Sequence, residues 1–274
     1  RQVYGRHALA LPIPDAVNVT VTRASELSHD LPREFVDLLL NELGVDDKGW
    51  RISIDSQLPF GKGLGSSAAI AVAIVRAFNN ALKLGLGDER VNAIAFASEK
   101  LAHGTPSGVD NTLATLAKPM LFRNAGGLQF EALVINTPPP LIVAWGQETG
   151  RTNEQVAGVR KRREQSVEHF DQLFDEMDRL SLQGAEFLQA AKWEELGALM
   201  NICHGLLNAT GVSTPDLERM VALARQCGAV GAKITGAGGG GSIVALCPGN
   251  SSAVATGLRR AGYQTLVLAG KQTP

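Results

Sequence analysis

A glycine-rich loop that runs directly into an apolar helix constrains the fold of this chain most. Residues 59–69 read Pro-Phe-Gly-Lys-Gly-Leu-Gly-Ser-Ser-Ala-Ala, and apolar residues then recur at helical spacing up to Leu82. Glycines at alternate positions let successive backbone N–H groups turn toward one concave site. The helix adds the unpaired N–H groups and the positive dipole end of its first turn. The segment therefore predicts a helix N-terminus that binds an anion such as phosphate.

The loop also has a purely structural explanation. Its residue order matches neither the P-loop pattern G-x-x-x-x-G-K-[ST] nor the dinucleotide turn G-x-G-x-x-G. The hydroxyls of Ser66 and Ser67 can bond a phosphate oxygen or ligate Mg²⁺, but the serines could equally cap the helix after a tight glycine turn. A second glycine segment, residues 233–242 (Lys-Ile-Thr-Gly-Ala-Gly-Gly-Gly-Gly-Ser), favours ligand binding, because so many glycines cost backbone entropy. A bulged hairpin loop is the alternative for this segment.

Length and composition indicate a soluble protein of two lobes. The 274 residues exceed what one core usually serves, and 45% hydrophobic with 19% charged residues is a globular balance. A formal charge of −1 gives no global attraction to nucleic acid or anionic lipid. The longest nearly apolar stretch, residues 68–78, contains Arg76 and is too short to span a bilayer. We therefore expect no nucleic-acid partner and no membrane partner.

The cysteines favour a reducing compartment. Cys203, Cys227 and Cys247 are odd in number and widely spaced, and they form no C-x-x-C pair. This pattern predicts free thiols and a cytoplasmic location rather than a disulfide framework or a zinc site.

Periodicity and turn residues predict an α+β fold, because helices and strands mix without a regular βα repeat. Strands are expected at residues 4–14, 16–23 and 50–54, with helices at 35–43, 68–82 and 88–101, the last with Asp88 as N-cap. One long helix is expected at 153–180, with Thr152 and Gln155 at capping-box spacing. More helix follows at 183–207, then a helix opened by Thr214 and Pro215, a strand–glycine loop–strand unit at 230–246, and a final helix and strand. The prolines at 138–140 place the lobe boundary between residues 1–138 and 139–274.

Two acidic residues are candidates for phosphoryl-transfer chemistry. Glu99 lies near the end of a predicted helix and Asp110 follows shortly after, in the segment His-Gly-Thr-Pro-Ser-Gly-Val-Asp-Asn at 103–111. Such chemistry needs Mg²⁺ to neutralise charge and a group that orients the attacking hydroxyl, and one carboxylate can serve each purpose. Spacing alone equally allows Glu99 to be a solvated surface residue beside Lys100 and Asp110 to be a helix cap. His103 is interpreted as a helix C-terminal residue without a catalytic role.

The two glycine segments and residues 103–111 together resemble the three motifs of the GHMP small-molecule kinases. The middle motif looks most like that of the mevalonate kinases, in which the third position is commonly Asn and is Thr105 here. Residues 149–156 and 206–215 also look like this family, so the resemblance covers nearly the whole chain.

The resemblance implies a two-lobed GHMP kinase fold, with an N-terminal lobe of the ribosomal-protein-S5 type and a ferredoxin-like C-terminal lobe. It implies ATP- and Mg²⁺-dependent phosphorylation of the 5-hydroxyl of mevalonate, in isoprenoid biosynthesis. The alternatives are another GHMP kinase, acting on phosphomevalonate or a sugar, and a catalytically impaired nucleotide-binding homologue. Whether the protein forms a homodimer is left open.

The resemblance also assigns site residues. Asp110 matches the catalytic aspartate, and Glu99 with Ser67 (or Ser66) matches the Mg²⁺ ligands. The residues expected to bind ATP are Gly61, Lys62, Gly63, Leu64, Gly65, Ser66, Ser67, Gly238 and Gly239. The residues expected to bind substrate are Thr152, Gly236 and Ala237.

One departure from the family pattern concerns the first residues. Mevalonate kinases carry a strand with a catalytic lysine and a Gly-Glu-His segment before the Val-Tyr-Gly-Arg that is found here at residues 3–6. Either the sequence continues upstream of Arg1 or this copy is impaired. Lys62 could substitute in part for that lysine, but we interpret it as a solvated loop residue.

Overall fold

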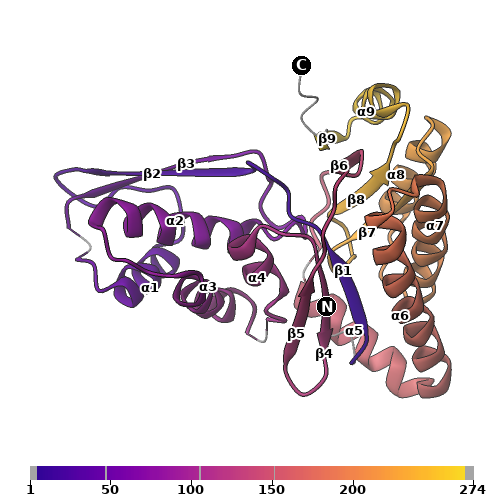
Figure 1. The fold of residues 1–274 in the computed structure, drawn as a ribbon, viewed down its shortest axis with the longest axis horizontal. Helices are drawn as coiled ribbons and strands as arrows, with labels where there is room; N and C mark the ends of the chain where they lie inside the picture. Colours follow the sequence, from indigo (N-terminus) through magenta and orange to yellow (C-terminus); the bar gives the residue numbers. More distant parts are fainter. Residues whose placement is uncertain (1–4, 47, 105, 151, 269–274) are drawn as a thin grey trace. The chain divides into compact units, whose positions relative to one another are not determined.

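The described residues form an α+β protein. The computed structural model describes residues 5–46, 48–104, 106–150 and 152–268, with the backbone alone at 102 and 103. Its contacts divide the chain into two compact units (Figure 1). Unit 1 comprises Arg1–Leu11, Gly61–Leu64 and Lys118–Pro274, and unit 2 comprises Pro12–Phe60 and Gly65–Ala117. The glycine-rich loop at 61–65 therefore contributes to both units.

Unit 2 is built around one buried helix. It contains strands β2 (Val17–Arg23) and β3 (Trp50–Ser56), which pair antiparallel, and helices α1 (Arg33–Leu43), α2 (Ser66–Leu82), α3 (Asp88–His103) and α4 (Val109–Leu116). α2 has an apolar face without Pro or Gly, and Ile70, Ile74 and Phe78 on it are fully buried. The Phe78 ring meets Trp50 of β3 edge to face at 5.1 Å between centroids, which ties the helix to the two-stranded sheet.

Unit 1 contains a four-stranded antiparallel sheet covered by helices on both faces. The strand order is β7 (Gly231–Thr235), β8 (Ser242–Leu246), β6 (Leu141–Trp145) and β9 (Gln264–Leu268). Ile142 and Ile243 point to a core shared with α8 (Pro215–Gln226) and α9 (Ser251–Arg260). Leu141 and Leu246 point to the opposite core, with α6 (Val167–Gln189) and α7 (Trp193–Ala209) (Figure 1). The alternation of strand residues between two cores explains why these strands read as continuous apolar runs.

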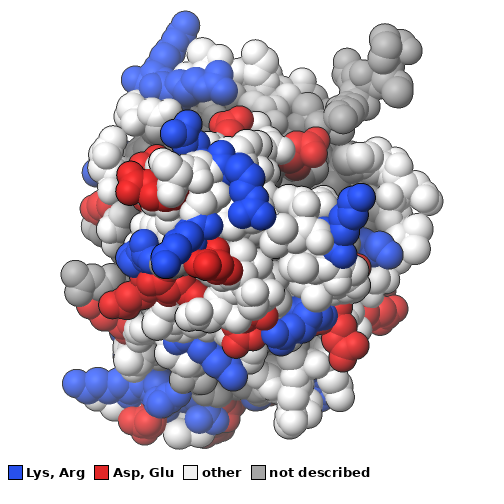
Figure 2. All heavy atoms as spheres, turned by 90° about the vertical axis from the view of Figure 1, so that its left-hand side faces the viewer, with Lys and Arg blue, Asp and Glu red and all other residues white. Residues whose placement is uncertain are grey.

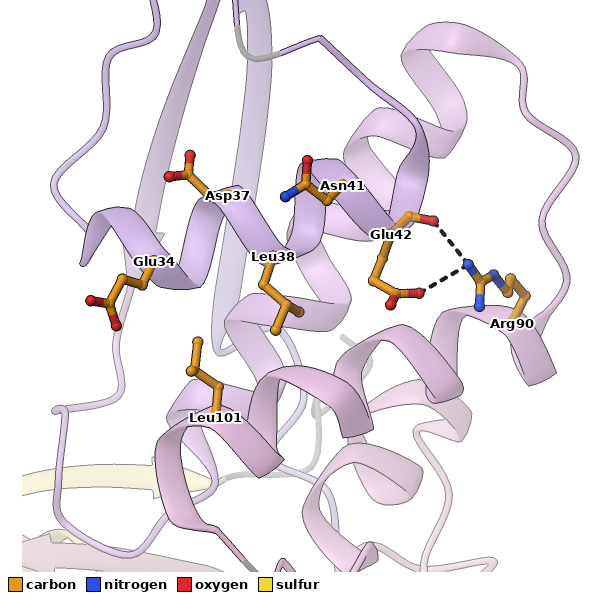
Figure 3. Close-up of a pocket in the computed structure, with 7 residues that line it drawn as sticks. All are labelled: Glu34, Asp37, Leu38, Asn41, Glu42, Arg90 and Leu101. Carbon is orange, nitrogen blue, oxygen red and sulfur yellow. Dashed lines mark hydrogen bonds and ion pairs between the residues drawn. The ribbon is translucent and has the colours of Figure 1, made fainter.

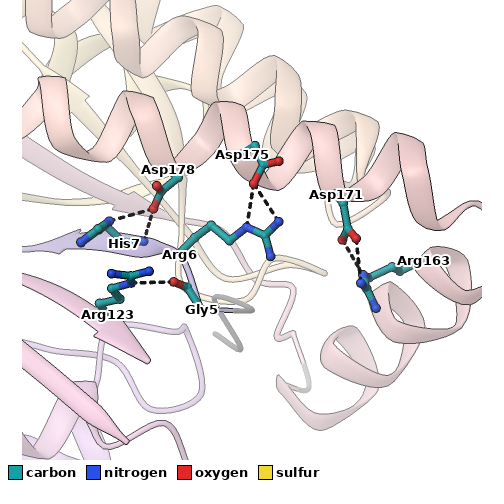
Figure 4. Close-up of polar contacts among 8 residues, drawn as sticks. All are labelled: Gly5, Arg6, His7, Arg123, Arg163, Asp171, Asp175 and Asp178. Atoms are coloured by element: carbon teal, nitrogen blue, oxygen red, sulfur yellow. Dashed lines mark hydrogen bonds and ion pairs between the residues drawn. The ribbon is translucent and has the colours of Figure 1, made fainter. Parts of the chain in front are cut away.

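A second sheet in unit 1 has the order β1 (His7–Ala10), β4 (Met120–Asn124), β5 (Leu128–Ala132). α6 holds β1 through a row of carboxylates (Figure 4). Arg6 donates to Asp175 at 2.7 and 2.9 Å, and the backbone and ring nitrogens of His7 contact Asp178. These contacts join two segments that are about 170 residues apart in the sequence.

Most of the predicted elements are confirmed, with shifts at their ends. The strand–glycine loop–strand unit is β7 and β8, and Thr214 caps α8, since its Oγ1 accepts from Leu217 N at 3.3 Å. The strand expected at 4–14 is shorter in the described residues, and β4 and β5 were not predicted. The cap expected at Asp88 was wrong: Gly87 is the N-cap, and Asp88 accepts a 2.8 Å bond from Arg76 instead.

The single long helix expected at 153–180 was also wrong. It is two helices, α5 (Thr152–Gln165) and α6, separated at Ser166, whose φ of −154° is not helical. The break separates two different environments. α6 buries Phe170 and Phe174, whereas none of the described α5 residues is buried.

The compact units do not follow the linear boundary placed at 138/139. Strands β1, β4 and β5 precede the prolines in sequence but belong to the unit that contains the four-stranded sheet. The assignment of residues 1–138 and 139–274 to two family lobes stays a prediction.

Two general surface properties bear on partners. On the face drawn in Figure 2, Lys and Arg side chains intermingle with Asp and Glu. Among the helices in the described part of the chain, none combines the length and apolar character needed to cross a membrane.

We predict that Phe78→Ala destabilises the protein strongly. Phe78 is 0% exposed, and truncating a buried Phe typically costs about 3–5 kcal/mol, because burial is lost and a cavity remains. Phe60 is 57% exposed and serves as a control, since Phe60→Ala should change stability by less than about 0.5 kcal/mol. Urea unfolding of both variants measures the difference, and equal losses would contradict this account of the core.

Candidate functional site

The start of α2 leaves backbone N–H groups without a side-chain cap. Gly65 is the N-cap, in the left-handed region with φ 70°, and no side-chain cap hydrogen bond is made there. The first intrahelical bond runs from Ala69 N to Gly65 O at 3.0 Å. The alternative in which the serines cap this helix was therefore wrong. The geometry retains the anion-binding property expected of a helix N-terminus.

Ser67 and Glu99 meet at this helix start. Ser67 Oγ, in the first turn of α2, donates to Glu99 Oε1 of α3 at 2.5 Å. Glu99 is only 3% exposed, so its interpretation as a solvated surface residue was wrong. A carboxylate is kept in such a place when hydrogen bonds or a cation compensate for its lost hydration.

Asp110 lies against the same helix start. It is in the first turn of α4, whose N-cap is Gly108, so Asp110 is not the cap. A Cβ built on Gly65 would lie 3.4 Å from both Cβ and Cγ of Asp110, so Asp110 packs directly against the residue from which α2 begins. Unit 2 therefore brings Gly65, Ser67, Glu99 and Asp110 to one place.

Buried amides hold α4 in register. Asn111, next to Asp110, donates through Nδ2 to Asn92 Oδ1 of α3 at 2.6 Å. Arg76 of α2 donates to the carbonyl of Thr115 at 2.7 Å, near the other end of α4. Because these bonds attach α4 to both α2 and α3, they hold in place the helix turn that carries Asp110.

Lys62 is held inside unit 1 and is not a solvated loop lysine. It is 8% exposed, and Nζ donates to the carbonyls of Gln147 and Glu148 at 2.8 and 2.7 Å. Burial lowers the pKa of Lys62, although the charges of Asp216 and Glu148 act in the opposite direction. No local signal predicted this, because both acceptors lie about 85 residues further along the chain.

The second glycine segment packs against the first. A Cβ on Gly236 would lie 2.7 Å from Gly63 O, and one on Gly241 would lie 2.8 Å from Lys62 O. Ser242 Oγ also donates to Lys62 O at 3.0 Å. The sequence correctly indicated that something approaches this backbone closely. Part of what approaches it is the backbone of residues 62 and 63.

Two further segments support the glycine loop at 236–241, a role that no local sequence pattern predicts. We call residues 147–150 the strap and residues 210–214 the corner. Gly241 N donates to Glu148 O of the strap at 3.2 Å, and Gly239 N donates to Val212 O of the corner at 2.7 Å. The amide of Gly239, predicted to bind ATP, is thus already donated to the protein in this conformation. In the sequence these segments are marked only by the resemblance of residues 149–156 and 206–215 to the kinase family.

Glu218 of α8 binds the corner through Ser213. Its carboxylate accepts from Ser213 and lies 3.2 Å from Nε2 of His204 of α7. Burial raises the pKa of Glu218, but the Ser213 hydrogen bond and the His204 interactions outweigh it, so the pKa is below its usual value. The pKa of His204 is also lowered, chiefly by burial, against the opposing effect of Glu218.

Some residues named in the sequence-based predictions lie next to, or outside, the residues that the structure describes. α5 begins at Thr152, but Arg151 lies outside the described residues, so the capping box stays a prediction. Thr105 and the side chain of His103 also lie outside them. The Gln155 amide faces the glycine loop, since a Cβ on Gly239 would lie 2.2 Å from its Nε2.

A separate pocket of about 620 Å³ lies between α1 and α3 and contains none of the predicted site residues (Figure 3). The residues that line it are Glu34, Asp37, Leu38, Asn41, Glu42, Arg90 and Leu101. Arg90 donates to the carbonyl and carboxylate of Glu42, so the one basic group is neutralised by an acid. The acidic side chains that line this pocket would repel the negative charge of a phosphate, so the pocket does not suit one.

A metal site here would use few protein ligands. Within the described residues, no group of three or more His, Cys, Asp or Glu side chains could hold a metal ion. The Ser67 hydroxyl and the Glu99 carboxylate are the oxygen donors that Mg²⁺ accepts alongside phosphate oxygens. The donor set therefore fits Mg²⁺ bound together with a nucleotide.

Comparisons with known proteins agree on one family. The model of the GHMP kinases N terminal domain matches residues 30–118, and that of the GHMP kinases C terminal domain matches 185–264. A mevalonate kinase of Thermococcus sibiricus is 40% identical over 86% of this chain and 71% of its own length. One of Methanothermobacter thermautotrophicus is 33% identical over 94% and 89%.

Solved structures give the same result. The crystal structure of L. major mevalonate kinase in complex with R-mevalonate matches with a TM-score of 0.84 and 31% identity, over 94% of this chain and 86% of that one. The Methanococcus jannaschii mevalonate kinase matches with a TM-score of 0.81 at 22% identity, over 97% and 92%, which supports the fold alone.

We predict that His204 makes stability fall in mild acid. A histidine whose pKa is lower in the folded than in the unfolded state binds fewer protons when folded, so stability rises with pH up to the usual value of 6.5 and is lost below it. His204→Gln should therefore reduce the loss of melting temperature between about pH 7.5 and about pH 5. Equal losses in the variant and the original protein would contradict the direction of this pKa.

Proposed function

The chain belongs to the GHMP kinase family, and from that premise we propose that it transfers the γ-phosphoryl group of ATP to the 5-hydroxyl of mevalonate. The single observation that best supports this is the likeness to the L. major enzyme solved with R-mevalonate, at 31% identity over 94% of the chain. Relatives with the same name at 33–41% identity cover most of the chain as well. The products are 5-phosphomevalonate and ADP. This reaction is a step of isoprenoid biosynthesis.

In this proposal the start of α2 binds the ATP phosphates. Gly61 to Ser67 contribute backbone N–H groups, and the dipole of α2 favours the negative charge. Gly236, Ala237, Gly238 and the backbone around them contact phosphate or substrate, with Thr152 as a further substrate contact. Lys62 shapes the loop through the strap carbonyls rather than reaching into solvent.

Asp110 is the proposed catalytic residue. Its carboxylate accepts or orients the proton of the 5-hydroxyl while that oxygen attacks the γ-phosphorus, and the bond to the β,γ-bridging oxygen breaks as ADP leaves. The proton goes to the Asp110 carboxylate. The polar network around α4 limits the entropy lost in bringing the carboxylate to the hydroxyl.

Ser67 and Glu99 are the proposed Mg²⁺ ligands. When bound, the ion neutralises charge that develops on the phosphate oxygens. The chain's part is to hold the two oxygen donors together, which the 2.5 Å hydrogen bond already does. A cytoplasmic location is part of the proposal, and the free state of all three cysteines is consistent with it.

A substrate panel tests the proposed function. The purified chain should release ADP from ATP and Mg²⁺ when mevalonate is supplied, and should do so far more slowly with phosphomevalonate or galactose. Turnover with one of the other acceptors but not with mevalonate would reassign the enzyme within its family. ATP binding without product from any acceptor would favour the impaired homologue.

We predict that Asp110→Asn lowers kcat by at least about a hundredfold, because the carboxylate that receives the proton is replaced by a neutral amide of similar size. ATP affinity, measured by calorimetry, should change little. Asp55→Asn, an exposed residue of β3, is the matched control and should keep normal kcat. A normal rate in the Asp110 variant would remove Asp110 from the mechanism.

We predict that Glu99→Gln raises the Mg²⁺ concentration needed for half-maximal activity by on the order of tenfold or more, since the amide keeps its shape but loses the charge that binds the ion. Glu89→Gln, on the exposed surface of the same helix, should leave the Mg²⁺ dependence unchanged. Titration of activity with Mg²⁺ at saturating ATP distinguishes the two. An identical titration curve for both variants would exclude Glu99 as a ligand.

A further inference from the structure

The glycine loop at 236–241 does not determine its own shape. Five of its six residues are glycines with φ between 73° and 112°, and glycine permits many alternatives to this conformation. Its amides donate to two other segments, from Gly239 to Val212 O at 2.7 Å and from Gly241 to Glu148 O at 3.2 Å. The loop is therefore only as well ordered as the corner and the strap.

One guanidinium secures the corner. Arg162, near the end of α5, donates through Nε to Thr210 O at 2.8 Å and through a terminal nitrogen to Gly211 O at 3.2 Å. These are the two residues immediately before Val212, whose carbonyl accepts from Gly239. A charged donor gives stronger bonds to carbonyls than a neutral one, and the fork of Arg fits two adjacent acceptors.

Two glycines leave room for this side chain. A Cβ on Gly211 would lie 3.0 Å from Arg162 Nε, and a Cβ on Gly158, one turn earlier on α5, would lie 3.1 Å from Nη1. Both distances are shorter than ordinary van der Waals contact. The guanidinium therefore occupies a niche that any larger residue at either position would narrow.

We propose that Arg162 is a positioning residue for phosphoryl transfer, acting through the corner on the glycine loop. The contacts run in two steps. The Arg162 guanidinium donates to the Thr210 and Gly211 carbonyls, and the next carbonyl, that of Val212, accepts from the Gly239 amide. α5 supports the same loop at a second point, since Gln155 lies seven residues before Arg162 and faces Gly239. The inference rests on the proposed function for its kinetic consequence, but the order of the loop can be measured without it.

The neighbouring residue provides a matched control. Arg163 is also on α5 and partly buried, but it pairs with Asp171 of α6 through two bonds of 2.7 and 2.9 Å (Figure 4). This ion pair attaches α5 to α6. Replacing Arg163 therefore shows how activity changes when the attachment of α5 to α6 is weakened and Arg162 is kept.

The first experiment compares Arg162→Met with Arg163→Met in the full chain. We expect Arg162→Met to lower kcat/KM by on the order of tenfold to a hundredfold, because small displacements of positioning groups have effects of this size. Arg162→Lys should recover part of the loss, since one ammonium can bond only part of the corner. Hydrogen–deuterium exchange over residues 236–241 should become faster in Arg162→Met and stay unchanged in Arg163→Met.

The second experiment separates position from stability. Gly158→Ala should preserve or raise the melting temperature, since Ala is favoured over Gly within a helix by about 1 kcal/mol, yet kcat/KM should fall because the niche narrows. Gly205→Ala is the control, because a Cβ there meets nothing within 4 Å and activity should be unchanged. A merely structural role for Arg162 would not make a stable variant slow.

The outcomes are distinct. The proposal would be overturned if Arg162→Met kept both the original exchange rate over the loop and a normal kcat/KM. It would also be overturned if Arg163→Met lost as much kcat/KM as Arg162→Met. A normal rate in Gly158→Ala would contradict the niche on which the inference depends. Absence of mevalonate turnover in the original protein would refute the proposed function, and the exchange measurement would then still decide whether Arg162 orders the loop.

Discussion

The hydrogen bond between Ser67 and Glu99 is the interaction on which the candidate site of unit 2 depends. It joins the first turn of α2 to α3 and gives a partner to a carboxylate that is almost fully buried. An unpartnered carboxylate in this position would oppose folding, because its hydration is lost on burial. The position is also next to the first backbone N–H groups of α2, whose N-cap, Gly65, makes no side-chain hydrogen bond. The site thus holds a negative charge beside a region that attracts negative charge, an arrangement that suits a cation between the protein and an anionic ligand.

The glycine segments perform two tasks that sequence inspection tends to merge. Gly65, beside Asp110, supplies the left-handed backbone conformation from which α2 begins, so it serves the candidate site directly. Gly236 and Gly241 instead permit the chain to pack backbone against backbone within unit 1. A glycine-rich loop therefore need not present every amide to a ligand, and the amide of Gly239 is already donated to Val212.

Much of the fold and part of the site could be predicted from the sequence, because they depend on local patterns. The apolar spacing of α2, the cap at Thr214 and the β7–loop–β8 unit are all encoded by neighbouring residues. The break at Ser166 could not be predicted, because it depends on two helices meeting different surroundings, which spacing along one chain does not reveal. Lys62 shows the same limit at the site, since its carbonyl acceptors are remote in sequence and belong to backbone, which carries no residue-specific signal.

α5 illustrates a consequence of how the glycine loop is supported. None of its described residues is buried, so the hydrophobic effect contributes little to its docking, which relies on polar contacts such as those of Arg162 and Arg163. Charge-dependent contacts near the surface weaken as dissolved ions screen them, over distances of about 8–10 Å at ordinary ionic strength. The ionic composition of the surrounding solution therefore becomes one determinant of how firmly a backbone loop with no charge of its own is held.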